Sequence, residues 1–191
     1  MNEAVNQDLN KCLEALKRGG VIIYPTDTVW GIGCDATDSK AVRRVFEIKR
    51  RADSKALITL VDSVVALERV VTDVPEVAYQ LVDVAVEPMT VVYDRGIGVA
   101  PELLADDGSI GVRITSEEFS RELCRRFRRP IVSTSVNISG EPAPHSFDEI
   151  NPELLAQVDY VCQSNRDAPW ASKPSTVIKL SAGGVIKILR K

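Results

Sequence analysis

The sequence predicts an α/β fold, a mixed sheet with helices packed on it, and two observations support this. Short β-branched runs alternate along the chain with segments of helical periodicity, as expected where strands and helices follow one another. The 191 residues are 45% hydrophobic, which is enough for a sizeable core. Because no repeat, low-complexity tract or linker divides the chain, we expect one domain over residues 1–191.

The first half of the chain opens with a helix. An amphipathic pattern predicts this helix over about 7–18, and Gly19-Gly20 is a typical helix end. The strand 21–24 follows, and then a loop rich in hydroxyl groups. Apolar residues at helical spacing predict the next helix over about 39–50. Further on we expect a strand at 56–61 and helices near 63–71 and 75–86.

The second half contains most of the expected strands. "TSEE" precedes "FSRELCRRF" and matches a capping box, with Thr115 as the N-cap and Glu118 three residues on. "SAGG" separates two β-rich runs and predicts a hairpin over about 175–190. The other expected elements are strands at "MTVVYD", "IGVRI", "PIVSTS" and "VDYVC" and a helix near 147–157.

Composition and cysteine usage argue against several classes of protein. No apolar stretch is long enough to span a bilayer and the N-terminus carries acids, so we expect a cytoplasmic protein without membrane contact. The four cysteines lie far apart and form no Cys-x-x-Cys pair, which favours buried, reduced thiols. The only histidine, His145, lies in a proline-rich loop, which argues against His-based catalytic units and metal sites.

Cations gather in two segments of a chain whose net charge is −3. Residues 40–55 carry seven basic side chains and residues 121–129 carry five, for which a solvated helix face is the commoner explanation. Lys49 lies in register with the apolar stripe of its helix, where it either reaches out to water or faces the core. Arg51 and Lys55 follow closely, and three cations this close together favour an anion between them, such as phosphate or carboxylate.

Polar side chains interrupt two predicted strands in positions that suit a cleft. Arg113 lies in the apolar strand "IGVRI", where it either points to solvent or clamps a carboxylate. Ser133, Ser135 and Asn137 have a spacing of two, so they share one face if the strand persists. In a water-excluded cleft such groups are neutral hydrogen-bond donors for a charged ligand. The other residues expected at this cleft are Thr26, Thr28, Gly31 and Gly33.

Together these segments resemble a known family, the YrdC-like domain of threonylcarbamoyl-AMP synthases. They occur in the family's order and at similar spacing, from about residue 10 to residue 190. Each segment alone is a weak signal, but the ordered set covers nearly the whole chain. The segments are "YPTDTVWGIGCDAT", "RRVFEIKRRADSKALI", "IGVRI", "STSVNISG", "KPSTVIKL" and the final "ILR".

The resemblance implies a twisted open mixed sheet with a large, concave, basic cavity. It also implies synthesis of threonylcarbamoyl-AMP and pyrophosphate from L-threonine, bicarbonate or CO2, and ATP, with Mg²⁺ bound through the nucleotide. The product would serve threonylcarbamoyl-adenosine modification of tRNA. The expected partners are therefore the tRNA threonylcarbamoyl-transfer proteins, together with tRNA or double-stranded RNA itself.

The same resemblance assigns the site residues by their position in the matching segments. The catalytic set is Lys49, Arg51, Ser135 and Asn137. The ATP-binding set is Lys49, Arg51, Lys55, Ser109, Ser135 and Arg190. The threonine-binding set is Thr28, Arg113, Ser133 and Ser175.

The sequence departs from the family pattern at three places. The family's Trp-Pro-Gly-Pro-x-Thr loop is "VEPMT" here, of which only Pro88 and Thr90 remain, and a frequent His and a frequent Ser are Leu60 and Ala143. These departures bear on the details of the threonine pocket.

Two other functions stay open at this point. One is an RNA-binding module of the same fold without synthase activity, which the basic segments favour. The net acidity and the aromatic content of 5% argue against it, because few rings are present to stack on bases. The other is a paralogue that hydrolyses the adenylate, although the chain keeps both the Lys-x-Arg pair and Ser-x-Asn.

Overall fold

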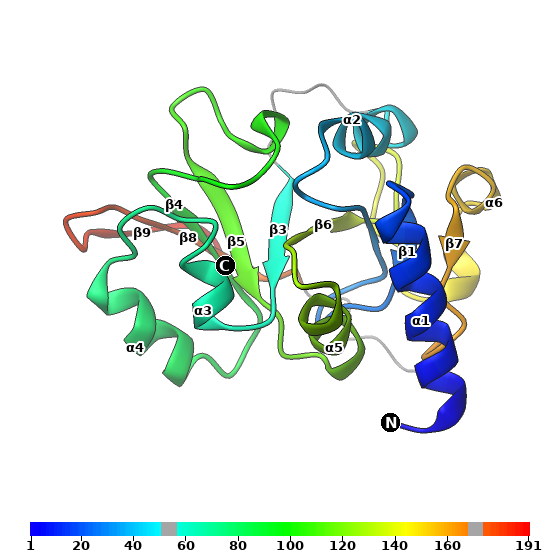
Figure 1. Ribbon diagram of the computed structural model, residues 1–191. Coiled ribbons are helices and arrows are strands. Elements are labelled where there is room, and N and C mark those ends of the chain that lie inside the picture. Colours follow the sequence, from blue (N-terminus) through cyan, green and yellow to red (C-terminus); the bar gives the residue numbers. More distant parts are fainter. Residues whose placement is uncertain (51–56, 168–173) are drawn as a thin grey trace.

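The computed structural model describes residues 1–50, 57–167 and 174–191. These residues form a nine-stranded mixed sheet in the order β7-β1-β2-β6-β3-β5-β4-β8-β9 (Figure 1). Three neighbouring pairs are parallel, β1 with β7, β3 with β5 and β4 with β8, and the others are antiparallel. The predicted α/β class with a mixed sheet is therefore confirmed.

Eight of the nine strands lie close to their predicted positions, whereas the strand Gly31–Gly33 was not among those predicted. The predicted C-terminal hairpin is present, since β8 and β9 pair antiparallel with an irregularity at Val177/Ile178. The strands are β1 (Ile22–Tyr24), β2 (Gly31–Gly33), β3 (Ile58–Val61), β4 (Met89–Tyr93), β5 (Ile110–Ile114), β6 (Ile131–Ser135), β7 (Tyr160–Val161), β8 (Thr176–Leu180) and β9 (Ile186–Arg190).

Helices α1, α3, α4 and α5 lie in front of the sheet in Figure 1, and α1 packs on α5. Their apolar side chains meet one side of the strands in two buried clusters. The helices are α1 (Glu3–Lys17), α2 (Ser39–Ile48), α3 (Val64–Leu67), α4 (Glu76–Val84), α5 (Glu118–Phe127) and α6 (Pro152–Leu155), with short 3₁₀ turns at Pro101–Leu103 and Phe147–Glu149. None of the helices in the described ranges has both the length and the apolarity needed to cross a membrane.

Several helix boundaries differ from prediction: α1 begins at Glu3 and not near residue 7, and α3 ends at Leu67 and not near residue 71. Thr115 is not the N-cap of α5, because its N–H donates to the Val61 carbonyl and its hydroxyl contacts Ser120. Glu117 caps the helix instead, accepting from the N–H groups of the second and third helical residues. The helix expected near 147–157 is interrupted at Ile150, whose backbone is extended, and restarts as α6.

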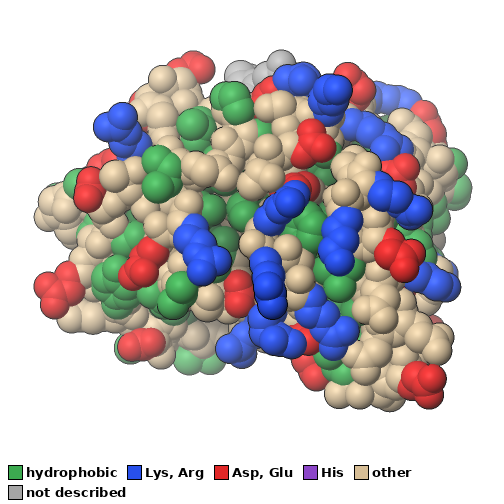
Figure 2. All heavy atoms as spheres, in the orientation of Figure 1, with side chains coloured by type: hydrophobic (Ala, Val, Ile, Leu, Met, Phe, Trp, Pro, Cys, Tyr) green, Lys and Arg blue, Asp and Glu red, His purple; other side chains and the backbone are tan. Residues whose placement is uncertain are grey.

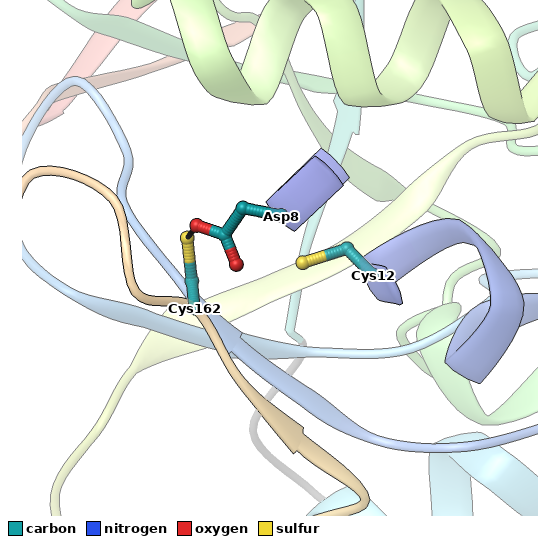
Figure 3. Close-up of side chains that lie close together, drawn as sticks. All are labelled: Asp8, Cys12 and Cys162. Carbon is teal, nitrogen blue, oxygen red and sulfur yellow. Dashed lines mark hydrogen bonds between the residues drawn. The ribbon is translucent and has the colours of Figure 1, made fainter. Parts of the chain in front are cut away.

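The N-terminal helix is fastened to the far edge of the sheet by Asp8, shown in Figure 3. Its carboxylate accepts from the Tyr160 hydroxyl (2.6 Å), the Cys162 thiol (2.8 Å) and the Ser164 N–H (2.6 Å). Cys12 lies beside Asp8 and Cys162. All four cysteines are buried and free, as expected. Because donors already occupy its carboxylate, this cluster fits a structural clamp better than a metal site.

The alternation of side chains along the central strands creates the site. In β4, β5 and β6 the residues Val91, Val112 and Val132 are buried in the core. Their neighbours in sequence point to the other side of the sheet, because successive side chains alternate. That other side carries the polar residues of the three strands, Thr90, Arg113, Ser133 and Ser135.

Candidate functional site

A cavity of about 400 Å³ lies on this polar side of the sheet. We call it the polar cavity. Its wall combines the loop after β1 with residues of β4, β5, β6, β8 and β9. Its polar lining residues are Thr26, Thr28, Thr90, Ser109, Arg113, Ser133, Thr134, Ser135, Ser175 and Arg190. Within the described chain no carboxylate lines it, so the wall presents hydroxyl donors and two cations.

The loop after β1 is held by its own threonines. The Thr26 hydroxyl donates to the Val29 carbonyl (2.7 Å) and accepts from the Thr28 N–H (3.2 Å). This bonding fixes the turn and leaves both threonines at the cavity wall. Gly31 lies beside them, where an added Cβ would meet Thr26 at 2.9 Å, so this part of the cavity requires a glycine.

Arg113 faces the polar cavity and not solvent, with 4% of its side chain exposed. Its Nη1 donates to the Thr28 hydroxyl (3.3 Å) and lies 3.3 Å from the Asp27 carboxylate, which is itself 5% exposed. Burial lowers the pKa of the Arg113 guanidinium, and the Asp27 charge opposes this shift. Arginine stays protonated under such conditions, so a permanent positive charge is fixed at the wall.

A second cation lines the same wall. Arg190 of β9 donates from Nε and Nη2 to the Ser175 carbonyl, at 3.2 and 3.0 Å. The Ser175 hydroxyl in turn contacts that of Thr90 at 2.9 Å. Arg190 and Ser175 therefore belong to one hydrogen-bonded unit that closes the cavity on the side of β8 and β9.

Lys49 is buried, with 2% exposed, so it does not reach out to water. Its Nζ donates to the Ser135 and Asn137 carbonyls and lies 3.4 Å from the Asn137 Oδ1. The Ser135 hydroxyl donates to the same amide oxygen. Lys49 thus links the end of α2 to the turn after β6, directly behind the part of the cavity that Ser135 lines.

The expected row of Ser133, Ser135 and Asn137 is only partly correct. β6 ends at Ser135, so the chain turns before Asn137 and the spacing of two no longer applies. The Asn137 amide donates to the Ile138 and Glu141 carbonyls, at 3.0 and 2.7 Å. Ser133 and Ser135 line the polar cavity, whereas Asn137 fixes the turn beside it.

The structure brings most of the expected site residues together. Lys49 and Asn137 adjoin the cavity through their bonds to Ser135. Arg51 and Lys55 lie outside the described residues. The expected residues at the cavity wall are Thr28, Ser109, Arg113, Ser133, Ser135, Ser175 and Arg190.

Asp27 and Thr90 are two residues at the site to which the sequence alone assigns no role. Thr90 is the last residue of "VEPMT" and lies two positions before Val92, so both side chains lie on the same side of the strand. This spacing could have placed Thr90 on the cavity side. Asp27 gives no comparable signal, because an aspartate in a loop is usually solvated. Its burial depends on β5, which follows more than eighty residues later and carries Arg113.

The family departures lie in different places. Leu60 is a core residue with 0% exposure, whereas Ala143 lines the polar cavity and offers no hydroxyl there. Glu87, Pro88 and Met89 of "VEPMT" line a second cavity of about 410 Å³. The altered loop thus faces a different space from the one that Thr90 lines.

The basic segment 121–129 lies away from the cavity, on the helix-covered side. Figure 2 shows basic side chains gathered over α5 and in the hollow between α5 and α2. Arg125 and Arg126 pair with Glu122, and Arg129 pairs with Asp35. These pairs support the commoner explanation for part of the segment, a charged helix face with local partners.

Comparison with known proteins identifies the family. The family model described as "Telomere recombination", the Sua5/YciO/YrdC domain, matches residues 14–191. The chain belongs to this family.

Individual relatives agree with this assignment. The putative threonylcarbamoyl-AMP synthase of Methanocaldococcus jannaschii is 37% identical over 191 residues, which covers 97% of this chain and 88% of the relative. The threonylcarbamoyl-AMP synthase of Xanthomonas campestris pv. campestris (strain B100) is 35% identical over 183 residues, or 94% and 97% of the two chains.

A solved structure shows the same fold with an amino acid bound. P. abyssi Sua5 complexed with L-threonine matches with a TM-score of 0.80 at 29% identity. The match covers 90% of this chain and 50% of that protein. This chain therefore spans about half the length of P. abyssi Sua5.

Proposed function

We propose that the protein is an L-threonylcarbamoyladenylate synthase, a nucleotidyltransferase of the cytoplasm. One observation carries the proposal: a buried arginine and a second cation line the same 400 Å³ cavity, among hydroxyl donors. Such a wall suits a ligand pair with one carboxylate and several phosphates. Membership of a family that includes threonylcarbamoyl-AMP synthases is consistent with it.

The threonine end of the site is built around Arg113. Its guanidinium would bind the threonine carboxylate, because a planar fork of N–H donors matches a carboxylate in geometry and charge. Thr28 and Ser133 lie along the same wall and would bind the amino acid's hydroxyl and amino nitrogen. Ser175 would complete this end, held in place by Thr90 and Arg190.

The nucleotide end would use Ser109, Ser135 and Arg190 at the wall, with Arg51 and Lys55 from the segment beyond the described residues. Lys49 and Asn137 would hold Ser135 in place and add positive charge behind it. Since no carboxylate lines the described wall, Mg²⁺ fits only as an ion bound through phosphate oxygens and water. When bound it would neutralise phosphate charge.

The reaction has two steps. The threonine amino nitrogen attacks CO2 and loses a proton to solvent, which forms a carbamate. A carbamate oxygen then attacks the α-phosphorus of ATP, and the bond from that phosphorus to the β-phosphate bridging oxygen breaks to release pyrophosphate. The cations near the phosphates would stabilise the charge that develops there.

The product would serve threonylcarbamoyl-adenosine formation in tRNA, with tRNA threonylcarbamoyl-transfer proteins as partners. Direct contact with tRNA or double-stranded RNA stays a prediction. Two adjoining surface hollows that share Arg129 are the region that suits it, since they carry seven cations against three carboxylates. Hydrolysis of the adenylate would need a positioned base, and the described wall of the polar cavity carries neither a carboxylate nor a histidine.

The proposal is tested by pyrophosphate release from purified protein with ATP and bicarbonate, comparing threonine, serine and no amino acid. We expect release only with threonine. Lys49→Ala, Arg51→Ala and Arg113→Ala should each lower it about a hundredfold, because losing one such charge from a transition state costs about 3 kcal/mol. Lys11→Ala, on the exposed side of α1, is the matched control and should leave the rate unchanged. Near-normal rates in the folded site variants would refute the assignment.

A further inference from the structure

Asp27 is a buried carboxylate whose role the proposed reaction does not explain. It lies in the loop between β1 and β2, with 5% of its side chain exposed. Within the described chain neither of its oxygens accepts a hydrogen bond, and its one close partner is Arg113 at 3.3 Å. A buried charge is costly unless a partner compensates it. A buried carboxylate whose oxygens accept no hydrogen bond therefore calls for a functional reason.

Asp27 and Arg113 stand between two cavities. Arg113 and Thr28 line the polar cavity, whereas Asp27 lines the second cavity of about 410 Å³. The second cavity is walled mainly by apolar side chains of α3, α4 and the strands beneath them. Asp27 is not part of the polar cavity's wall, so it would hold Arg113 from behind without touching a ligand bound in front.

The hydrogen bonding of Arg113 shows which edge of its guanidinium is engaged. Nη1 is directed to Thr28 and Asp27, at 3.3 Å from each. Nε is buried and has no acceptor in the part of the chain that the structure describes. Nε and Nη2 form the edge that an incoming carboxylate binds with two parallel hydrogen bonds. An anion in the polar cavity would supply the acceptor that Nε lacks.

Asp27 also balances charge in the cavity. Arg113 and Arg190 line the same wall, and their mutual repulsion disfavours the charged state of the buried guanidinium. Asp27 opposes this repulsion from the far side. Removing its charge would leave the two cations of this wall without that opposing charge, and among the described residues only the Thr28 hydroxyl would still hold Nη1 of Arg113.

We propose that Asp27 is a positioning residue for amino-acid binding: it holds the Nη1 edge of Arg113, so that the Nε edge is presented to the substrate carboxylate. This inference rests on the proposed function, because it names threonine as the ligand of Arg113. It predicts that Asp27 affects the binding of threonine and not the binding of the nucleotide.

The first test separates the two substrates. Asp27→Asn keeps the side chain's volume and removes its charge, and we expect the KM for threonine to rise at least about tenfold, or about 1.4 kcal/mol. The KM for ATP should stay within about twofold, since Asp27 lies on the threonine side. Asp62→Asn is the matched control: Asp62 lines the same second cavity, forms no ion pair with Arg113, and should change neither constant.

Chemical rescue supplies a readout that a merely structural role would not move. Asp27→Ala opens a space that is continuous with the second cavity, through which a small anion can enter. We expect formate to restore threonine affinity in Asp27→Ala but not in Arg113→Ala, where the partner of the anion is absent. Thermal unfolding of each variant shows whether it is folded at the assay temperature.

A double-mutant cycle on threonine affinity, measured by calorimetry, decides whether Asp27 acts through Arg113. Asp27→Asn combined with Arg113→Ala should bind threonine no more weakly than Arg113→Ala alone. Additive losses, or unchanged affinity in folded Asp27→Asn, would overturn the proposal. Because calorimetry needs no turnover, it tests Asp27 even if wild-type protein released no pyrophosphate, an outcome that would remove the proposed reaction instead.

Discussion

Single residues at the central strands decide whether the polar cavity can exist. On one side of β4, β5 and β6 the polar residues Thr90, Arg113, Ser133 and Ser135 line the cavity, and on the other side Val91, Val112 and Val132 are buried in the core. The direction of the Arg113 side chain could not be predicted from the sequence, because its position in "IGVRI" suits a side chain that points to solvent as well as one that points into a cavity. Only Asp27 and Thr28, brought from a distant loop, make the cavity side favourable.

At Gly33, strands β2 and β6 approach so closely that a larger side chain should measurably lower the free energy of unfolding. A Cβ added there would lie 1.8 Å from the Val132 carbonyl oxygen, a backbone atom that cannot move aside. We expect Gly33→Ala to lower the free energy of unfolding by about 3 kcal/mol, because β2 would be forced away from β6. Urea denaturation measures this.

Gly183→Ala is the matched control for that substitution, because a Cβ there meets nothing within 4 Å. Its free energy of unfolding should stay within about 0.5 kcal/mol of the wild-type value. If Gly33→Ala were as stable as this control, the tight β2–β6 contact in the structure would be wrong.

Among the elements, α5 is a helix whose existence the sequence predicts but whose N-terminal residue it does not. The "TSEE" motif predicted a helix here correctly, but it pointed to Thr115 and not Glu117 as the cap. Thr115 is drawn into the end of β5 by its bond to the Val61 carbonyl, a contact between segments far apart in the chain. Local motifs do not record such competition, which is why helix ends are harder to predict than helices.

The charged side of α5 makes a prediction about pH. Arg125, and then Arg126, hold the pKa of Glu122 down to about 2 in the folded protein, from an ordinary value near 4.5. A depressed carboxyl pKa stabilises the fold above the unfolded pKa, and this contribution is lost as the pH falls from about 4.5 toward 2.

Glu122→Gln should therefore be less stable than wild type at pH 6 by at most about 1 kcal/mol, since both arginines are partly exposed. The difference should shrink at pH 3 and vanish below it. Urea denaturation of both proteins at pH 6 and pH 3 measures it. A difference that stayed constant over this range would show that the Glu122 pairs do not stabilise the fold.

At the scale of the whole molecule, the order of strands in the sheet brings residues that are far apart in the sequence to the wall of one cavity. β5 and β6 are both neighbours of β3, and β8 joins β4, so Arg113, Ser133 and Ser175 meet although they span more than sixty residues. The alternation of strands and helices predicted the α/β class, but periodicity alone does not fix strand order. The resemblance of the ordered segments predicts a shared site, and the structure places Lys49 beside Ser135 and Asn137.

The central claim is that the polar cavity holds a threonine carboxylate at Arg113 with a nucleotide beside it. The most direct measurement is a crystal structure of the protein with L-threonine and a non-hydrolysable ATP analogue. We predict the carboxylate within hydrogen-bonding distance of Arg113 Nε and the phosphates near Ser135 and Arg190. Threonine bound elsewhere, with Nε still lacking an acceptor while the nucleotide is in place, would contradict it.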